Sequence, residues 1–404
     1  MIISNKLSKM LSGNSQIRQM FEEGNKLKKQ YGEDKVYDFS LGNPNAKIPF
    51  ELKQAMLDII SEDREEAHVY MSNAGFEEVR ESIAQAVNKR FNSSYNYNNF
   101  IMTVGAASAL NIVLKSILNE GDEVICFAPY FLEYKTYVEN YNGKLISIDT
   151  SKTDFLPEQK TLEAAISKKT KAVIINSPNN PTGVIYSKAV LKEINQCIKE
   201  CAQKYDIDII TISDEPYREL VYVEKEVPWV PEFIENSVVV YSYSKSLSLA
   251  GERIGWLLIP DECVCSKELI GACTISNRAL GCVNAPSLMQ RLIAACPNAK
   301  VDVSFYDKNR KVLYNGLKKL GFEMLYPEGG FYIFLKTPVE ERLFIEKCKE
   351  HRILLVSGTA FDCSGYVRIA YCVSEQTVLN SLESFRLVAK ECGLLQTEAN
   401  ISID

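Results

Sequence analysis

Short apolar runs alternate with amphipathic stretches between about residues 100 and 260. We expect the apolar runs to be strands, and they lie at Ile101–Val104, Glu123–Phe127, Lys144–Ile148, Ala172–Asn176, Ile207–Ser213, Val238–Tyr243 and Trp256–Ile259. The stretches between them have helical periodicity, at Ala107–Asn119, Phe131–Tyr141, Glu158–Ser167 and Ser187–Tyr205. This alternation predicts an α/β fold, with a mostly parallel seven-stranded sheet flanked by helices. The link from Ser244 to Gly255 is barely long enough for a crossover, which favours an antiparallel last strand.

The pattern changes after about Asn284. The elements expected there are a long helical region to about Leu320, strands at Phe322–Tyr326 and Phe331–Lys336, a helix at Val339–Glu350, short strands near Ile353–Val356 and Tyr366–Ala370, and a final helix from about Ser374. This grouping predicts a smaller α+β domain. We expect residues 46–290 to form the large domain, and residues 1–45 and 291–404 the small domain with a connecting helix. The segment before about Pro49 has no strong strand and is expected to pack on the small domain.

Composition narrows the function classes. The 404 residues carry a net charge of −6, which argues against nucleic acid or an anionic membrane as a partner. No apolar run has the length of a signal peptide core or a membrane span, so a cytoplasmic protein is expected. The twelve cysteines are scattered, and only two histidines are present, so no metal site is predicted.

The most informative segment is Ser242-Tyr243-Ser244-Lys245, followed by Gly251-Glu252-Arg253-Ile254-Gly255. It follows a predicted strand, and ligands of open α/β sheets gather outside the carboxyl ends of the strands. The Lys245 amine can form a Schiff base with an aldehyde there, and Arg253 can hold a dianionic phosphate. For an arbitrary lysine, a solvated surface loop would be the ordinary explanation.

Two further polar segments also follow predicted strands. Asn180 lies in Asn176-Ser177-Pro178-Asn179-Asn180-Pro181-Thr182-Gly183, whose composition equally suits a turn. Asp214 and Tyr217 lie in Ser213-Asp214-Glu215-Pro216-Tyr217. A carboxylate there can pair with a protonated ring nitrogen, and a tyrosine can donate to a phenolate oxygen, although Asp214 could equally be a helix cap.

Three weaker signals complete the set. The small residues Gly105, Ala106 and Ala107 separate a strand from a helix, where backbone amides can approach a phosphate, or simply pack closely. The ring of Phe131 could stack on an aromatic cofactor or pack in the core. Arg368 interrupts an apolar strand pattern, which suits a carboxylate clamp or a residue facing the surface.

In this order and spacing, the segments resemble those of the class I and II aminotransferases, which have the fold-type I architecture of pyridoxal phosphate enzymes. The resemblance extends from Ser40-Leu41-Gly42-Asn43-Pro44 to Arg368. It implies pyridoxal 5′-phosphate as cofactor, an α-amino acid and a 2-oxo acid as substrates, and a homodimer with shared active sites.

The resemblance also implies a role for each residue. Lys245 would carry the cofactor and move the proton, Asp214 would face the ring nitrogen, and Asn180 and Tyr217 would donate to the phenolic oxygen. The phosphate would lie against Gly105, Ala106, Ala107, Ser242 and Arg253, with Tyr70 reaching it from the partner subunit. Phe131 would stack on the ring. Arg368 would clamp the substrate carboxylate, with Asn180 and Gly42 beside it.

One residue departs from part of the family. Some members that prefer aspartate carry a lysine or a threonine where this chain has Ala107, so a dicarboxylic substrate is not implied here. Two other functions use the same residues: a lyase that eliminates a β-substituent, such as a carbon–sulfur lyase, and an inactive cofactor-binding regulator. A nicotinamide-dependent dehydrogenase would need a Gly-x-Gly-x-x-Gly turn, and Gly105 lacks the companion glycines.

Overall fold

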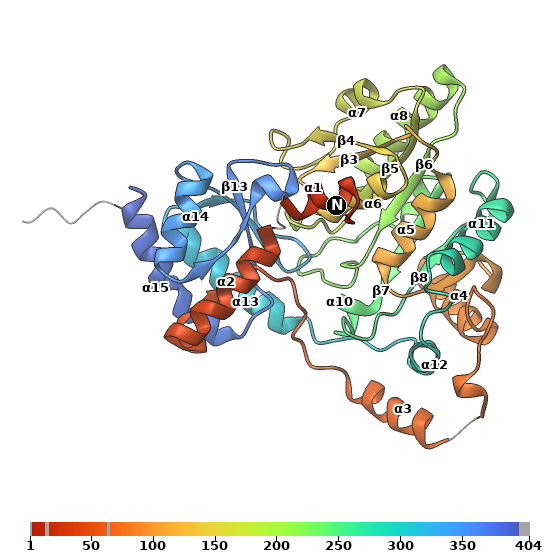
Figure 1. The fold of residues 1–404 in the computed structure, drawn as a ribbon, viewed down its shortest axis with the longest axis horizontal. Helices are drawn as coiled ribbons and strands as arrows, with labels where there is room; N and C mark the ends of the chain where they lie inside the picture. Colours follow the sequence, from red (N-terminus) through yellow and green to blue (C-terminus); the bar gives the residue numbers. More distant parts are fainter. Residues whose placement is uncertain (1, 13–15, 63–64, 396–404) are drawn as a thin grey trace, which may run out of the picture.

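The computed structural model describes residues 2–12, 16–62 and 65–395 (Figure 1). Its large sheet has seven strands in the order β2-β8-β7-β6-β5-β3-β4. Their bounds are β2 Phe100–Thr103, β3 Glu123–Ala128, β4 Lys144–Asp149, β5 Thr170–Asn176, β6 Ile210–Asp214, β7 Ser237–Ser242 and β8 Gly255–Leu258. Only β8 runs antiparallel to its neighbours, β2 and β7, within this sheet. The predicted mostly parallel sheet and its antiparallel last strand are therefore confirmed.

Helices cover both faces of this sheet, so its central strands are buried on both sides. From residue 50 to β8 the α-helices are α3 Phe50–Ser61, α4 Glu77–Phe91, α5 Ala106–Ile117, α6 Glu133–Asn140, α7 Gln159–Ala165, α8 Lys188–Tyr205, α9 Val230–Phe233 and α10 Tyr243–Ser246. Two more follow it, α11 Ser266–Ala279 and α12 Ser287–Ala295. Residues of α5 and α11 pack on one face of the strands, and those of α7 and α8 on the other.

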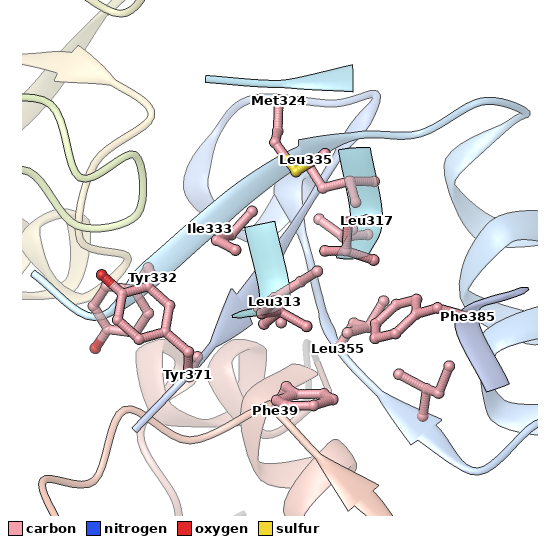
Figure 2. Packing of buried hydrophobic residues seen from close by; sticks show 14 of the residues in the cluster. Phe39, Leu313, Leu317, Met324, Tyr332, Ile333, Leu335, Leu355, Tyr371 and Phe385 are labelled. Atoms are coloured by element: carbon pink, nitrogen blue, oxygen red, sulfur yellow. The ribbon is translucent and has the colours of Figure 1, made fainter. Parts of the chain in front are cut away.

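The second part of the molecule is built on a four-stranded antiparallel sheet in the order β12-β13-β10-β9. The strands are β9 Glu323–Met324, β10 Tyr332–Lys336, β12 Val356–Ser357 and β13 Tyr366–Ala370, and the helices around them are α13 Ser304–Lys319, α14 Glu341–Glu350 and α15 Glu375–Glu391. Figure 2 shows their shared core, with Phe385 at one side and Tyr332 and Tyr371 at the other. Tyr332 thereby lies at the edge of this core, where it also lines the cavity described below.

The N-terminal segment divides between the two parts. Strand β1 (Tyr37–Asp38) pairs in parallel with β11 (Ile353–Leu354), and Phe39 is buried in the core of the small sheet, as expected for packing on the second part. Helix α2 (Gln16–Tyr31) lies on the same side in Figure 1. Helix α1 (Asn5–Ser12) differs from the expectation, because Lys6 Nζ donates to the carbonyl of Glu139 in α6.

The long helical region expected to reach about Leu320 is divided into two helices, α12 and α13. The chain leaves the helical conformation after Ala295 and resumes it at Ser304. Pro297 lies in the interruption, where it has no N–H to donate and disfavours a helical residue before it. Leu292 and Ile293 of α12 pack with residues of β2 and β8. We therefore propose that the boundary of the large domain lies after α12 rather than at residue 290.

Among the described residues, no helix is long and apolar enough to cross a membrane. The cytoplasmic location stays a prediction from the sequence.

Candidate active site

Segments far apart in the chain meet in a cavity of about 290 Å³ beyond the carboxyl ends of β5, β6 and β7. The predicted site residues that line it are Gly42, Ala106, Ala107, Phe131, Asn180, Asp214, Tyr217, Ser242, Lys245, Arg253 and Arg368. Parallel strands bring their carboxyl ends to one edge of a sheet, so residues that follow different strands converge there. Arg368 comes from β13 of the small sheet, so the cavity lies between the two parts of the molecule.

One end of the cavity, the phosphate end, is formed by the start of α5 and the segment after β7. Gly105 caps α5 with φ of +89°, and a side chain at that position would come within 2.8 Å of the Arg253 guanidinium. The first amides of a helix lack intrahelical acceptors, so those of α5 are available to an anion. Arg253 Nη1 donates to Ser244 Oγ at 3.2 Å, and Ser242 Oγ donates to Ser244 Oγ at 2.8 Å. This end suits a dianionic phosphate.

Lys245 lies in α10, next to the phosphate end. Its ammonium donates to the carbonyl of Gly42 at 2.7 Å and lies 5.4 Å from the centre of the Phe331 ring. Burial lowers the pKa of Lys245 to about 8, with smaller contributions in the same direction from the positive charges of Arg368 and Arg253. Because an amine must be neutral to attack an aldehyde, this lowered pKa suits Schiff-base formation near neutral pH.

Asp214 ends β6 and is 4% exposed. Tyr134 of α6 donates its phenolic proton to Asp214 Oδ2 at 2.5 Å, while Oδ1 is buried without a hydrogen-bond partner. Burial raises the pKa of Asp214 to about 7, although the bond from Tyr134 lowers it. A buried carboxylate oxygen without a partner is costly, so this residue fits a cationic donor in the cavity, such as a protonated pyridine nitrogen.

Arg368 is buried and held by both parts of the molecule. Its Nη1 donates to Asn180 Oδ1 at 3.2 Å and its Nη2 to the carbonyl of Ser40 at 2.7 Å, while Nε has no partner. The guanidinium lies 4.4 Å from the centre of the Tyr332 ring. A buried arginine without a carboxylate partner retains its positive charge in a low dielectric, so it favours an anionic ligand.

Gly42 is packed so tightly that no side chain fits there. A Cβ atom at this position would lie 1.9 Å from Tyr332 Oη. The Tyr217 and Tyr332 hydroxyls are 3.2 Å apart, and burial raises the pKa of Tyr217 well above its usual value. Tyr217 is therefore protonated and can donate a hydrogen bond into the cavity.

Tyr70 is the predicted site residue that lies away from this cavity. Its side chain is 91% exposed, which leaves it accessible to a second copy of the chain. Its proposed reach to a partner's phosphate is a statement about the dimer and stays a prediction.

Sequence reasoning missed the partners of the predicted residues. Tyr134 holds Asp214, and Tyr332 stacks on Arg368. Asn176 donates to the Asp214 carbonyl at 2.8 Å and accepts from the Asn180 amide at 2.8 Å. Asn176 opens a segment that the sequence already singled out, and Tyr134 is one helical turn after Phe131, so its spacing was a usable signal.

Known proteins match nearly the whole chain. A family model described as Aminotransferase class I and II matches residues 34–385. An aspartate aminotransferase from Pyrococcus horikoshii is 30% identical, over 92% of this chain and 94% of that protein.

Solved structures agree with this result. The crystal structure of an amino transferase from Eubacterium rectale has a TM-score of 0.94 and 38% identity, covering 97% of this chain and 99% of that one. An aspartate aminotransferase from Thermus thermophilus, solved with maleate, has a TM-score of 0.82 and 27% identity, covering 93% and 96%.

Proposed function

Since this chain belongs to the class I and II aminotransferases, a family of pyridoxal phosphate-dependent enzymes, we propose a transamination for it. It moves the amino group of an α-amino acid with an uncharged side chain to a 2-oxo acid. The observation that carries the proposal is the cavity that joins Lys245, Asp214 and Arg368. These supply an amine of lowered pKa, a carboxylate oxygen without a partner and a buried cation.

The residues present fit the cofactor. Arg253, Ser242 and the first amides of α5 would hold its phosphate, Asp214 Oδ1 its ring nitrogen and Tyr217 its phenolic oxygen, beside Phe131. When bound, pyridoxal phosphate supplies an aldehyde for the substrate's amino group and a ring that withdraws electrons from the α-carbon.

In this proposal Arg368 binds the substrate carboxylate, and its unpaired Nε–H supplies a donor that the protein leaves open. Arg368 is fixed by Asn180 and by the Ser40 carbonyl, so the carboxylate is held in one orientation. Lys245 Nζ, neutral above its pKa of about 8, takes a proton from the substrate α-carbon and later returns it. Asp214, as the anion, would keep the ring nitrogen beside its Oδ1 protonated.

The substrate side chain is proposed to be uncharged because each positively charged residue of the cavity already has another role. Lys245, Arg253 and Arg368 are the positively charged residues that line the cavity in the part of the chain that the structure describes, and each has a role above. Ala107 has no charge to offer a second carboxylate. The Pyrococcus and Thermus relatives are named aspartate aminotransferases, so this preference would distinguish the chain from them.

The proposal is tested by adding single amino acids, without a 2-oxo acid, to the holoenzyme and following its visible absorbance. An amino acid with an uncharged side chain should convert the cofactor to its amine form and yield one equivalent of 2-oxo acid. Aspartate should do so more slowly at equal concentration. Faster conversion by aspartate would refute the substrate preference, while pyruvate and ammonia formed in many turnovers would indicate elimination instead of transamination.

We also propose a homodimer in which Tyr70 reaches the partner's phosphate end. Apolar side chains near Tyr70 in sequence are unusually exposed, with Phe50 at 78% and Ile60 at 66%, both in α3. Exposed apolar groups of this size favour burial against another surface. Sedimentation should give about twice the chain mass of 45.6 kDa, and Tyr70→Phe should weaken cofactor binding. A monomer with full activity would contradict the proposal.

A further inference from the structure

A second cavity, of about 350 Å³, lies beside α4, and none of its lining residues lines the catalytic cavity. Its walls come from α4, from β7 and β8, and from residues 296–300, which follow α12. Helices α4 and α12 pack on one another, at the end of the large sheet that carries β8 (Figure 1). The proposed transamination assigns no role to this cavity.

Aromatic rings form the inner wall of the cavity. Phe91 stacks on Trp229 with 4.1 Å between ring centres and 3° between ring planes. Tyr241 stacks on Trp256 with 4.8 Å between centres and 14° between planes. All four of these residues line the cavity, so their rings offer it apolar surface that a further aromatic ring can contact. The wall therefore suits an aromatic, apolar group.

Positive charge predominates in the lining. The acidic residue that lines the cavity, Glu219, is already held by a two-bond ion pair with Arg90, at 2.5 and 3.0 Å. Arg218 is likewise paired, with the buried Glu215. Lys89 and Lys300 are exposed, and within residues 2–12, 16–62 and 65–395 neither forms an ion pair. These two lysines leave a surplus positive charge beside the aromatic wall.

The cavity lies behind the segment that carries Lys245. Ser242, Ser244 and Lys245 line the catalytic cavity, whereas Tyr243, Ser246 and Leu247 line the second one. The end of β6 and the residues after it are divided in the same way: Asp214 and Tyr217 line the catalytic cavity, whereas Arg218 and Glu219 line the second one. A molecule in the second cavity would contact the backs of both catalytic segments.

We propose that this second cavity binds an aromatic monocarboxylate, with its ring against the tryptophan-lined wall and its carboxylate near Lys89 and Lys300. The volume lies within the range of small-molecule sites and admits one ring with a short chain. A neutral aromatic molecule would gain nothing from the lysines. A larger polyanion would approach the carboxylate of Glu219, so a single carboxylate suits the lining better.

The chain contains two tryptophans, Trp229 and Trp256, and both line this cavity, so tryptophan emission reports on it directly. The probe is 3-phenylpropionate, which is neither an amino acid nor a 2-oxo acid and cannot be turned over. Added to the holoenzyme at low salt, it should change the emission saturably. Its uncharged amide should bind about fivefold more weakly, and added salt should reduce the difference.

Substitutions in each cavity show where the probe binds. Lys89→Gln with Lys300→Gln should weaken binding about threefold to tenfold, because two exposed charge contacts are lost. Lys319→Gln, an exposed lysine at the end of α13, is the matched control and should have no effect. Arg368→Gln tests binding in the catalytic cavity and should leave the emission change intact. The proposal is overturned if no saturable change occurs, if acid and amide bind equally, or if the change needs Arg368 and not the two lysines.

Discussion

The two ends of the catalytic cavity differ in how far the protein satisfies its own polar groups. At the phosphate end, Arg253 donates to Ser244 Oγ and to the carbonyls of Ala250 and Val104. At the other end, the reaction end, Asp214 Oδ1 and Arg368 Nε have no partner. The pKa of Lys245 there is lowered to about 8, and that of Asp214 is raised to about 7.

This difference indicates that one end of the cavity serves to bind the cofactor and the other to carry out the reaction. A cation held in place by the protein is already oriented for an anion and loses little freedom when the anion binds. A buried group without a partner is unstable until a ligand supplies one, and its protonation is sensitive to what occupies the cavity. Substitutions of Lys245 and Asp214 should therefore change the rate of the reaction, those of Arg368 should mainly change substrate affinity, and substitutions at the phosphate end should mainly change cofactor affinity.

The largest effect is expected for Lys245→Ala. Loss of the amine removes the group that moves the proton, so the turnover number should fall by about 10⁴-fold, the upper end for general acid–base catalysis. The measurement is a steady-state assay with saturating cofactor, and Ser242→Ala at the phosphate end is the matched control. Normal turnover by Lys245→Ala would refute its role.

Asp214→Asn should lower the turnover number by about 10²- to 10³-fold, the usual cost of removing one electrostatic stabiliser. The amide is close in shape to the carboxylate but cannot keep a proton on the atom that it faces. A Ser242→Ala enzyme that lost as much turnover at saturating cofactor would remove the contrast between the two ends.

The same variant should stabilise the apoenzyme at high pH. The pKa of Asp214 is raised from 3.8 to about 7 by burial, so between these values the folded chain binds more protons than the unfolded chain. The contribution of this group to stability is therefore lost as pH rises from about 4 to 7. Urea unfolding at pH 8 should show apo Asp214→Asn more stable by roughly 2–4 kcal/mol, with a smaller gain at pH 5. An equal gain at both pH values would contradict the assigned burial.

Arg368→Lys should raise the KM for amino acids by about tenfold to a hundredfold, because an ammonium cannot reproduce the planar fork of the guanidinium. Its turnover number should change less than its KM. Initial rates over a range of donor concentrations separate the two constants, and an unchanged KM would exclude Arg368 as the carboxylate clamp.

The smallest effect is expected for Tyr134→Phe, which removes the hydrogen bond to Asp214 Oδ2 and keeps the ring. The turnover number should fall by about tenfold, the value of one hydrogen bond to a charged group. Because this bond lowers the pKa of Asp214, the acidic limb of the rate profile should move to higher pH. A lower rate with an unmoved profile would mean that Tyr134 acts only through packing.

The large sheet could be predicted from the sequence because its strands are buried on both faces and read as apolar runs. The strand β7, for example, is buried along its whole length and was predicted nearly to its bounds. From the sequence, a long helical region was predicted up to about Leu320, and the break between α12 and α13, in which Pro297 lies, was not placed. The contact of Lys6 with Glu139 could not be predicted, since it joins residues 133 positions apart.

The candidate site was predictable to a similar degree. Residues such as Asn180 and Lys245 follow strands and carry distinctive neighbours, so the sequence brought them together correctly. Their supporting contacts were not predictable, because Tyr332 reaches Arg368 through the pairing of β10 with β13. The unpaired oxygen of Asp214 could be found only from coordinates.

The most direct test of the account is to find which lysine holds the cofactor. The holoenzyme would be treated with sodium borohydride, digested and analysed by mass spectrometry. We expect a pyridoxyl phosphate adduct on the peptide that contains Lys245, at about one per chain. An adduct on another lysine, or none on an enzyme that is active in transamination, would contradict the central claim.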